Sequence, residues 1–319
     1  LAPAPDRALE PGEAWTVEIA TSDDRLPHWT DAPTAFAIAD GAAIPVHMAP
    51  VRLFGSTEPN RRGTMRLSTD ESPPVPVSVI PWPREVAVSG RRTAPSGFAI
   101  VAEDGAGDVV ADNFAALTQF LFPGEGIVRD DEEGGYPVDC RFDESLGEEA
   151  YAIAFSADGA DVTGGSEAGL LYGLVTLAQI GRGARLHPER FSFPTAGRIE
   201  DRPRMRWRGC HLDVARRFYS SEEVKQFLAI LAWNKLNVFH WHLSDDEAWR
   251  VEIDAVPALT GTVAWRGHAA PIPPLLGSGP EPEGGFYTQD AVRDIVDLAQ
   301  DFGIDVVPEI DVPGHCHAL

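Results

Sequence analysis

The sequence predicts an α/β protein whose last part opens a parallel (β/α)8 barrel. Three observations lead to this fold class. Along residues 206–319 three strand-like segments each end in charged side chains, two amphipathic helical segments separate them, and the order is strand, helix, strand, helix, strand. Such alternation is typical of a parallel sheet. In a barrel of this kind, the working groups lie at the C-terminal ends of the strands.

We predict three parts in order along the chain. Residues 1–79 hold short apolar runs such as WTVEIA and AFAIA, broken by Pro and Gly, and this pattern indicates a β-rich segment. Residues 80–197 form an α/β domain, and residues 198–319 begin the barrel. We found no internal repeat and no low-complexity tract in the chain.

The middle part reads as strands followed by one helix. FAIVAED and AYAIAFSADGADVTGG are strand-like, and the second includes a predicted hairpin at Asp158-Gly159. SEAGLLYGLVTLAQIG follows with helical spacing and is expected to end at Gly181. Because this helix is apolar on all sides, we expect it to be buried against the barrel.

The two helices of the barrel part carry start and stop signals. Ser220 with Glu223 forms a capping box before SSEEVKQFLAILAWNKL. Thr288 precedes TQDAVRDIVDLAQDFG as its N-cap, and Gly303 occupies a C-cap position. These signals support helices of ordinary length on either side of the middle strand.

Each of the three strands delivers polar groups to one rim. The first, MRWRGCHLDVARRF, ends on Asp213 and Arg216. The second, within NVFHWHLSDDEAWR, alternates like a buried strand and ends on Asp245. The third, GIDVVPEIDVPGHCHAL, ends on the charged and polar side chains Glu309, Asp311 and His315.

Composition excludes several partner classes. The chain has 319 residues, 44% of them hydrophobic, with 26 basic against 49 acidic side chains, giving a net charge of −23. Such a charge repels phosphate backbones and anionic lipids, so we expect no nucleic acid or membrane partner. No run of about 18 apolar residues is present.

Cys140, Cys210 and Cys316 are odd in number and lack metal-type spacing, which favours free, largely buried thiols.

A pair of histidines in the second strand raises a rival class. His240 and His242 form an HxH pattern like that of metal-dependent barrel hydrolases. The pattern alone is a weak signal, and histidines packed inside the barrel explain it more simply. We therefore predict no metal ligands and keep the metal hydrolase as the less favoured alternative.

Four ordered motifs carry a family resemblance. HLDVARRF, NKLNVFHWHLSDDEAWR, GGFYTQDAVRDIV and VVPEIDVPGH together resemble the family 20 glycoside hydrolases, the β-N-acetylhexosaminidases. Upstream, PWPREV and GGSEAGLLYGLVTLAQI are similar to the non-catalytic α/β domain that precedes the barrel in this family. The resemblance implies that residues 80–197 are this domain and act as a scaffold.

The resemblance also implies roles for five residues. Arg216 matches the arginine that grips the hydroxyls of the terminal sugar, and Glu309 is predicted to contribute to substrate binding. Asp245 and His315 match a relay behind the catalytic acid, in which the carboxylate fixes the tautomer and orientation of the imidazole. Asp311 is predicted to support the same site from inside.

The implied activity is that of an exo-β-N-acetylhexosaminidase. In this family the 2-acetamido carbonyl of the substrate attacks the anomeric carbon, and the product keeps its configuration through an oxazoline. No metal or organic cofactor is implied. The expected partner is an amino-sugar glycan, either a chitooligosaccharide or a glycoconjugate; preference between N-acetylglucosamine and N-acetylgalactosamine and the cellular compartment stay open.

One family feature is absent from these residues. The Asp-Glu pair that performs the chemistry follows a glycine pair well beyond the PGH motif, and residues 206–319 are fewer than the roughly 250 of a whole barrel. We therefore expect the chain alone to be inactive, completed by a second polypeptide or truncated. Three strands leave an unpaired edge, so it should aggregate or pair. A non-catalytic glycan-binding or structural fragment is the alternative.

Overall fold

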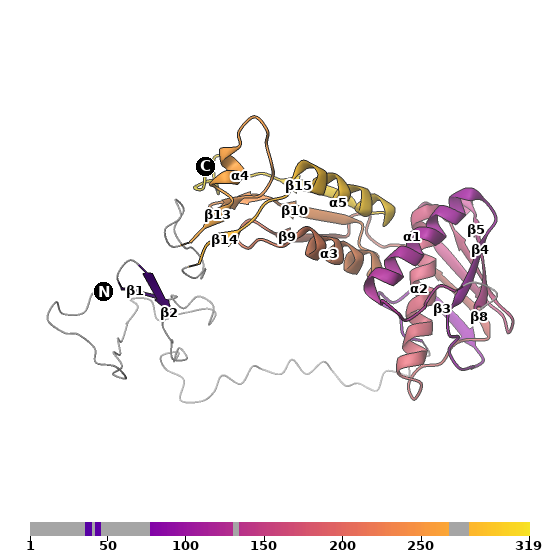
Figure 1. Ribbon diagram of the computed structural model, residues 1–319. Coiled ribbons are helices and arrows are strands. Elements are labelled where there is room, and N and C mark those ends of the chain that lie inside the picture. The colour runs from indigo at the N-terminus through magenta and orange to yellow at the C-terminus, as the bar shows by residue number, and fades with distance from the viewer. Residues whose placement is uncertain (1–35, 40–41, 46–76, 130–133, 268–280) are drawn as a thin grey trace, which may run out of the picture. The chain divides into compact units, whose positions relative to one another are not determined.

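The computed structural model describes residues 36–39, 42–45, 77–129, 134–267 and 281–319, and the chain divides into units over 1–66 and 67–319 (Figure 1). In the first unit β1 (Phe36–Ala39) pairs antiparallel with β2 (Ala42–Pro45). The predicted strand in AFAIA is therefore confirmed. The WTVEIA segment lies outside the described residues.

The second unit opens with a six-stranded mixed sheet in the order β3-β8-β6-β7-β5-β4. β6 and β7 are antiparallel neighbours joined by a tight turn, which confirms the hairpin at Asp158-Gly159. The strands are β3 (Glu85–Ser89), β4 (Phe98–Ala102), β5 (Tyr136–Phe142), β6 (Tyr151–Phe155), β7 (Ala160–Gly164) and β8 (Ala196–Asp201).

Two helices cover this sheet, and one of them was not predicted. α1 (Gly105–Leu121) follows β4, with a short 3-10 turn, η3 (Glu144–Leu146), later in the chain. α2 (Glu167–Leu186) continues past Gly181, so the predicted helix end is wrong. A Cβ at Gly181 would lie 2.8 Å from the ring of Phe98, so this glycine permits close packing against β4 rather than ending the helix.

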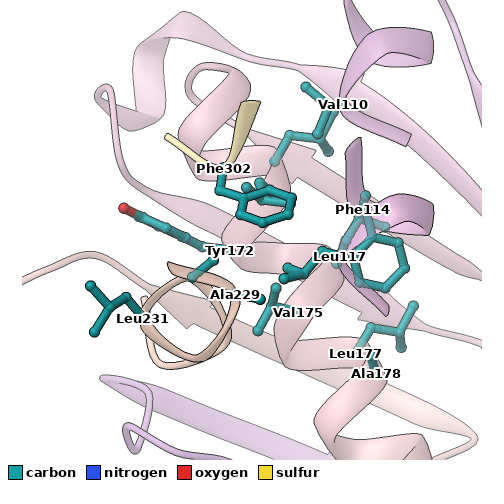
Figure 2. Packing of buried hydrophobic residues seen from close by; sticks show 14 of the residues in the cluster. Val110, Phe114, Leu117, Tyr172, Val175, Leu177, Ala178, Ala229, Leu231 and Phe302 are labelled. Carbon is teal, nitrogen blue, oxygen red and sulfur yellow. The ribbon is translucent and has the colours of Figure 1, made fainter. Parts of the chain in front are cut away.

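α2 is buried on nearly every side, as its apolar sequence predicts. It packs on β6 and β7 and against α1, and α1 in turn contacts α3 of the barrel part (Figure 1). One continuous apolar core therefore joins the sheet to the barrel strands. Figure 2 shows part of it, with labelled side chains that include Phe114 of α1, Val175 of α2, Ala229 of α3, and Phe302.

The barrel part holds three parallel strands in the order β15-β10-β9, which confirms the predicted α/β class and βα order. The regular elements are β9 (Gly209–Asp213), α3 (Ser221–Trp233), β10 (Val238–His242), α5 (Gln289–Asp301) and β15 (Asp305–Glu309). Between β10 and α5 lie β11 (Ser244–Asp245), β12 (Ala248–Trp249), α4 (Ala258–Gly261), β13 (Trp265–Arg266) and β14 (Glu283–Gly284).

The helix signals in the barrel part are confirmed. Ser220 and Glu223 form a complete capping box at α3. Thr288 accepts a hydrogen bond from the backbone N–H of Ala291, 3.1 Å away, at the start of α5. Gly303 follows α5 with φ of +67°, a left-handed conformation that glycine adopts readily.

Alternation along β10 decides which side chains reach the site. Phe239 and Trp241 are buried, and Phe239 makes an edge-to-face contact with Phe227 of α3. His240 and His242 point to the opposite face, which is the inner face of the barrel wall.

The three cysteines are free. Cys140 is buried, and burial raises the pKa of its thiol to about 12, so it is unreactive. Cys210 and Cys316 are only half-buried, contrary to the expectation of largely buried thiols.

Among the described residues, no helix has the length and apolar character needed to cross a bilayer.

Candidate active site

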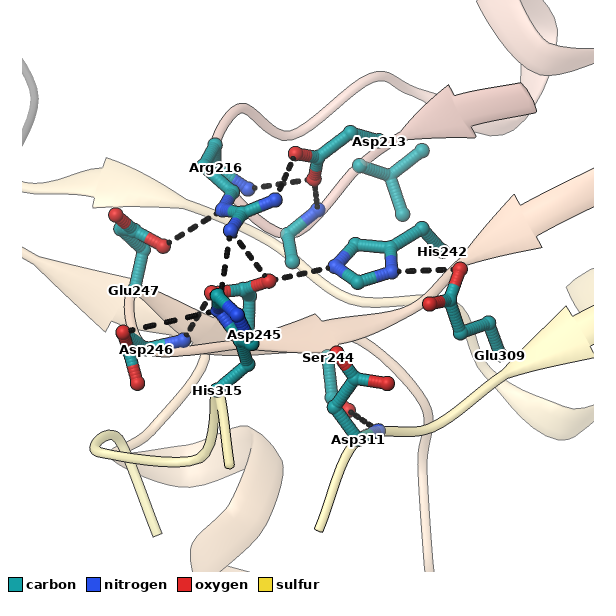
Figure 3. Close-up of polar contacts among 12 residues, drawn as sticks. Asp213, Arg216, His242, Ser244, Asp245, Asp246, Glu247, Glu309, Asp311 and His315 are labelled. Carbon is teal, nitrogen blue, oxygen red and sulfur yellow. Dashed lines mark hydrogen bonds and ion pairs between the residues drawn. The ribbon is translucent and has the colours of Figure 1, made fainter. Parts of the chain in front are cut away.

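Strand register brings the polar strand ends together. His242 pairs with Asp213 on one side and with Glu309 on the other, so the last residues of β9, β10 and β15 lie at one level. The loops that follow these strands carry Arg216, Asp245 and His315. Figure 3 shows that these groups converge at one rim.

Arg216 is held by three carboxylates. Its Nη1 lies 2.7 Å from Asp213 Oδ2, its Nη2 lies 2.7 Å from Asp245 Oδ2, and its Nε donates to Glu247 Oε2 at 3.1 Å (Figure 3). Burial lowers the pKa of Arg216, but the carboxylates outweigh burial and raise it. Each Nη nitrogen keeps a second N–H, and the side chain is 34% exposed, so hydroxyl groups can still reach the guanidinium.

Two arginines that sequence analysis did not single out support the loop of Arg216. Arg250 is buried and donates to the backbone carbonyls of Val214 and Ala215 at 2.9 and 2.8 Å. Arg266 donates through Nη2 to the carbonyl of Arg216 itself. Both partners are distant in sequence, so no local pattern could reveal them.

Asp245 lies at the centre of the site and is almost completely buried. Its Oδ2 faces Arg216 and also His242 Nε2, 2.8 Å away, while Oδ1 accepts from the backbone N–H of Asp246 at 2.7 Å. Burial would raise the pKa of Asp245, but the Asp246 N–H, His242 and Arg216 outweigh it and hold the pKa below its usual range. Asp245 is therefore ionised at neutral pH.

His315 faces Asp245 from the loop after β15. Its Nδ1 lies 3.2 Å from Asp245 Oδ1 and 3.4 Å from Arg216 Nη2. Its φ of +52° is a left-handed conformation that only a minority of non-glycine residues adopt. Because Asp245 accepts at Nδ1, the Nε2 atom of the exposed ring stays available to another group.

The loop after β15 is tied to the β11–β12 hairpin through its backbone. The N–H of Asp311 donates to Ser244 Oγ at 3.1 Å, and the N–H of His317 donates to Asp246 Oδ1 at 3.0 Å. The Asp311 carboxylate lies beside His242 and Asp245, with one oxygen within 4.8 Å of their ligand atoms. Its supporting role stays a prediction.

Glu309 points into the inner face of the strand layer. Its Oε2 lies 2.6 Å from His240 Nε2, 2.8 Å from His242 Nδ1 and 3.6 Å from His211 Nε2. Burial would raise the pKa of Glu309, but the histidines lower it below the usual range. Its predicted contact with substrate stays a prediction, since this oxygen already faces three imidazoles.

The spacing of these groups bears on the metal alternative. Two ligand atoms around one tetrahedral zinc lie about 3.3 Å apart, given metal–ligand bonds near 2.0 Å. His240 Nε2 and His242 Nδ1 instead lie 2.6 and 2.8 Å from the same Glu309 oxygen. These distances are those of direct contacts, although the ligand atoms of His211, His240 and Glu309 all lie within 4.8 Å of one another, as they do in two further groups of described residues. The absence of metal ligands therefore stays a prediction.

Comparison with known protein families identifies the family of this chain. Residues 205–319 match the description "Glycosyl hydrolase family 20, catalytic domain", and residues 77–202 match "Glycosyl hydrolase family 20, domain 2". The chain belongs to glycosyl hydrolase family 20. The predicted resemblance is therefore confirmed. The exact boundaries that we predicted at 79, 197 and 198 stay predictions.

Individual relatives agree with this family. The chain is 38% identical over 185 residues to a β-hexosaminidase of Vibrio furnissii, and 41% identical over 194 residues to a β-N-acetylhexosaminidase of Cellulomonas fimi. Each match covers 58% of this chain, and 30% and 36% of those proteins. The chain thus spans about a third of the length of these curated relatives.

Solved structures show the same likeness. The family 20 exo-β-N-acetylglucosaminidase of Vibrio harveyi, in complex with N-acetylglucosamine, superposes with a TM-score of 0.72 at 31% identity, covering 91% of this chain and 44% of that one. The family 20 β-N-acetylhexosaminidase of Streptomyces coelicolor A3(2) superposes with a TM-score of 0.60 at 33% identity, covering 77% of this chain and 48% of that one.

Proposed function

We propose that these residues belong to an exo-β-N-acetylhexosaminidase that releases terminal N-acetylglucosamine or N-acetylgalactosamine with retention of configuration. The observation that carries this proposal is the convergence of Arg216, Asp245 and His315 at the C-terminal ends of three parallel strands. A family 20 relative holds N-acetylglucosamine in its crystal structure, which supports an amino sugar as the substrate.

Each side chain has a distinct part in this reaction. The free N–H groups of Arg216 donate to adjacent sugar hydroxyls and fix the terminal ring. Asp245 accepts from His315 Nδ1, so His315 Nε2 is directed to a carboxylic acid that lies outside the described residues. That acid protonates the leaving oxygen and the glycosidic C–O bond breaks, while the acetamido oxygen of the substrate bonds to the anomeric carbon and forms the oxazoline in its N-protonated form. Water then opens the oxazoline from the same face as the departed group.

Hydrolysis by a catalytically complete protein that contains these residues tests the proposal. It should release 4-nitrophenol from the N-acetyl-β-glucosaminide and N-acetyl-β-galactosaminide but not from the β-glucoside, which lacks the acetamido group. Fluorination of the acetamido methyl should lower kcat/KM progressively because it weakens the carbonyl nucleophile. Equal rates on the β-glucoside would contradict the mechanism.

Arg216→Ala should raise KM for the N-acetylglucosaminide at least about tenfold, the effect of losing more than 1.4 kcal/mol of binding. Arg217→Ala is the matched control, because this neighbouring arginine lies over the ring of Tyr219 instead of in the carboxylate cluster. A KM unchanged in Arg216→Ala would contradict the role of Arg216 in substrate binding.

We expect no turnover from the 319 residues alone, because the described barrel part supplies three strands, fewer than the eight of a closed barrel. Titration of this chain with N-acetylglucosamine separates the alternatives. Measurable saturable binding without hydrolysis would favour a glycan-binding module instead.

A further inference from the structure

His242 has a carboxylate oxygen at each of its ring nitrogens. Nε2 lies 2.8 Å from Asp245 Oδ2, and Nδ1 lies 2.8 Å from Glu309 Oε2 (Figure 3). The His242 side chain is 5% exposed, and that of Asp245 is 1% exposed. The Nδ1 contact is bent away from ideal hydrogen-bond geometry, so we treat it as an ion pair.

This arrangement favours the protonated form of His242. A neutral imidazole carries one N–H donor and one acceptor nitrogen, whereas an ionised carboxylate only accepts. A neutral ring would therefore turn a lone pair toward one of the two carboxylates. Only an imidazolium presents an N–H to both.

We propose that His242 is a positioning residue for the reaction: held as an imidazolium between Glu309 and Asp245, it fixes one oxygen of Asp245 so that the other faces His315. The inference rests on the proposed function. It extends the predicted pair of Asp245 and His315 into a relay of alternating carboxylates and imidazoles. The relay runs from Glu309 on the inner face, through His242 and Asp245, to His315 at the rim.

The surroundings of His242 favour its cationic form. Four carboxylates face it or lie beside it: Asp213 at the end of β9, Asp245 of β11, Glu309 at the end of β15 and Asp311 after β15. The ring of His211 lies with its centroid 5.5 Å away, and the cation of Arg216 shares Asp245 Oδ2 with His242. Burial lowers the pKa of His242, but the carboxylates outweigh burial, and the net pKa is raised above the ordinary value. The surrounding carboxylates therefore favour the imidazolium to a higher pH than in an ordinary histidine.

A positioning role follows from what the relay leaves free. Oδ2 of Asp245 is occupied by Arg216 and His242, so Oδ1 is the oxygen that receives His315 Nδ1. Loss of the His242 charge would make Asp245 more basic and free it to turn. His315 would then lose its fixed orientation, although Arg216 would still bind the sugar.

Nitrogen-15 NMR of histidine side chains in the unmodified 319-residue chain tests the charge. We expect one histidine with both ring nitrogens protonated at neutral pH, assigned by its absence from His242→Gln. Glu309→Gln keeps His242 and should lower its titration midpoint, because one of the carboxylates that favour the imidazolium is lost. A neutral tautomer of His242 at neutral pH in the unmodified chain would overturn the proposal.

Kinetics of the catalytically complete protein test the positioning role. His242→Gln should lower kcat at least about tenfold with KM nearly unchanged, because a misaligned relay weakens acid catalysis and leaves binding intact. Glu309→Gln should move the alkaline limb of the kcat profile to lower pH, which a purely structural role would not do. His317→Gln changes an exposed histidine of the loop after β15 and is the control, which should keep the wild-type kcat and KM.

The outcomes separate the two proposals. An active wild-type protein with an unaltered kcat in His242→Gln overturns the relay alone. A wild-type protein without hexosaminidase activity overturns the proposed function, and the NMR result then still reports the charge of His242. Thermal unfolding of His242→Gln shows whether a lower kcat comes from a folded variant.

Discussion

Lys235 occupies a position that is unfavourable for lysine both in its backbone conformation and in the burial of its side chain. It follows α3 with φ of +58°, where glycine is the preferred residue, and the bonds from its N–H to Ala232 and from Leu236 N–H to Leu231 complete a Schellman-type helix end. Its side chain is buried, and among the described residues Nζ has no hydrogen-bond partner. The ring of Tyr151 lies 5.8 Å from Nζ, and the carboxylate of Asp201 also interacts with the charge without a direct bond to it.

Lys235→Met should stabilise the chain near neutral pH. Burial lowers the pKa of Lys235 to about 8, against about 10.5 in an unfolded chain. Burial of the charged ammonium therefore lowers the free energy of unfolding by its full amount below about pH 8, and this loss disappears as pH rises toward 10.5. We expect a gain of about 2 kcal/mol at about pH 7 that shrinks by about pH 10.

Urea unfolding at the two pH values measures this difference. The matched control is Lys225→Met, because Lys225 is the other lysine of the chain and lies on α3 in an ion pair with Glu222 at 3.3 Å. A Lys235→Met variant less stable than wild type at neutral pH would show that the ammonium has a favourable role at the seam between the two domains.

At the level of elements, the β11–β12 hairpin organises the site. It carries Asp245 and Glu247 toward Arg216 and ends beside Arg250, whose side chain reaches four backbone carbonyls. Those carbonyls belong to the loop after β9 and to the segments around β13 and β14: Val214, Ala215, Ala264 and Gly285. Arg250 thus fixes three segments that are separate in sequence.

Arg250→Met should destabilise the 319-residue chain by about 3 kcal/mol or more, because it leaves several buried carbonyls without donors. In the catalytically complete protein it should also raise KM, since the loop of Arg216 loses its support. Arg293→Met is the control: Arg293 is exposed on α5 and, within the part of the chain that the structure describes, pairs with residues of its own helix, so we expect a change within about 0.5 kcal/mol. Equal midpoints in chemical unfolding would contradict this account.

Prediction from sequence succeeded where signals are local. Capping residues at Ser220 and Thr288, together with alternation in β10, marked α3, α5 and the middle strand correctly. α1 is an exception: it was missed although Asp104 caps it and Val110, Phe114 and Leu117 lie at helical spacing on its buried face, so the local signal was present in the sequence. The end of α2 was predicted wrongly because Gly181 does not terminate the helix. Its lack of a side chain instead leaves room for the ring of Phe98, which is distant in sequence.

The residues of the site also fall into those that the sequence predicted and those that it did not. Arg216, Asp245 and His315 were predicted because the motifs that carry them are recognisable, and the structure brings them together. The roles of His242 and Arg250 were not predicted. Their partners come from strands and loops tens of residues away, and a sequence pattern holds no information on such contacts until strand register is known.

At the scale of the whole molecule, the described barrel wall has an uncovered apolar side. An apolar groove of about 680 Å³ runs along β15 and α5, lined by Trp241, Leu243, Val292, Val296, Ile304 and Val306, among others. β9 and β15 are the two edge strands of the three-stranded sheet. Exposed apolar surface beside an unpaired strand edge promotes association.

The 319-residue chain should therefore self-associate in solution despite its net charge of −23. Val296→Glu places a charge in the groove and should shift the chain toward monomer in sedimentation and light-scattering measurements over a wide range of concentration. Val109→Glu adds the same charge on the exposed side of α1, away from the groove, and should leave the association unchanged. A wild-type chain that stays monomeric at high concentration would show that the groove and the strand edges are not sufficient for association. If both variants weakened association equally, overall charge and not the groove would be its determinant.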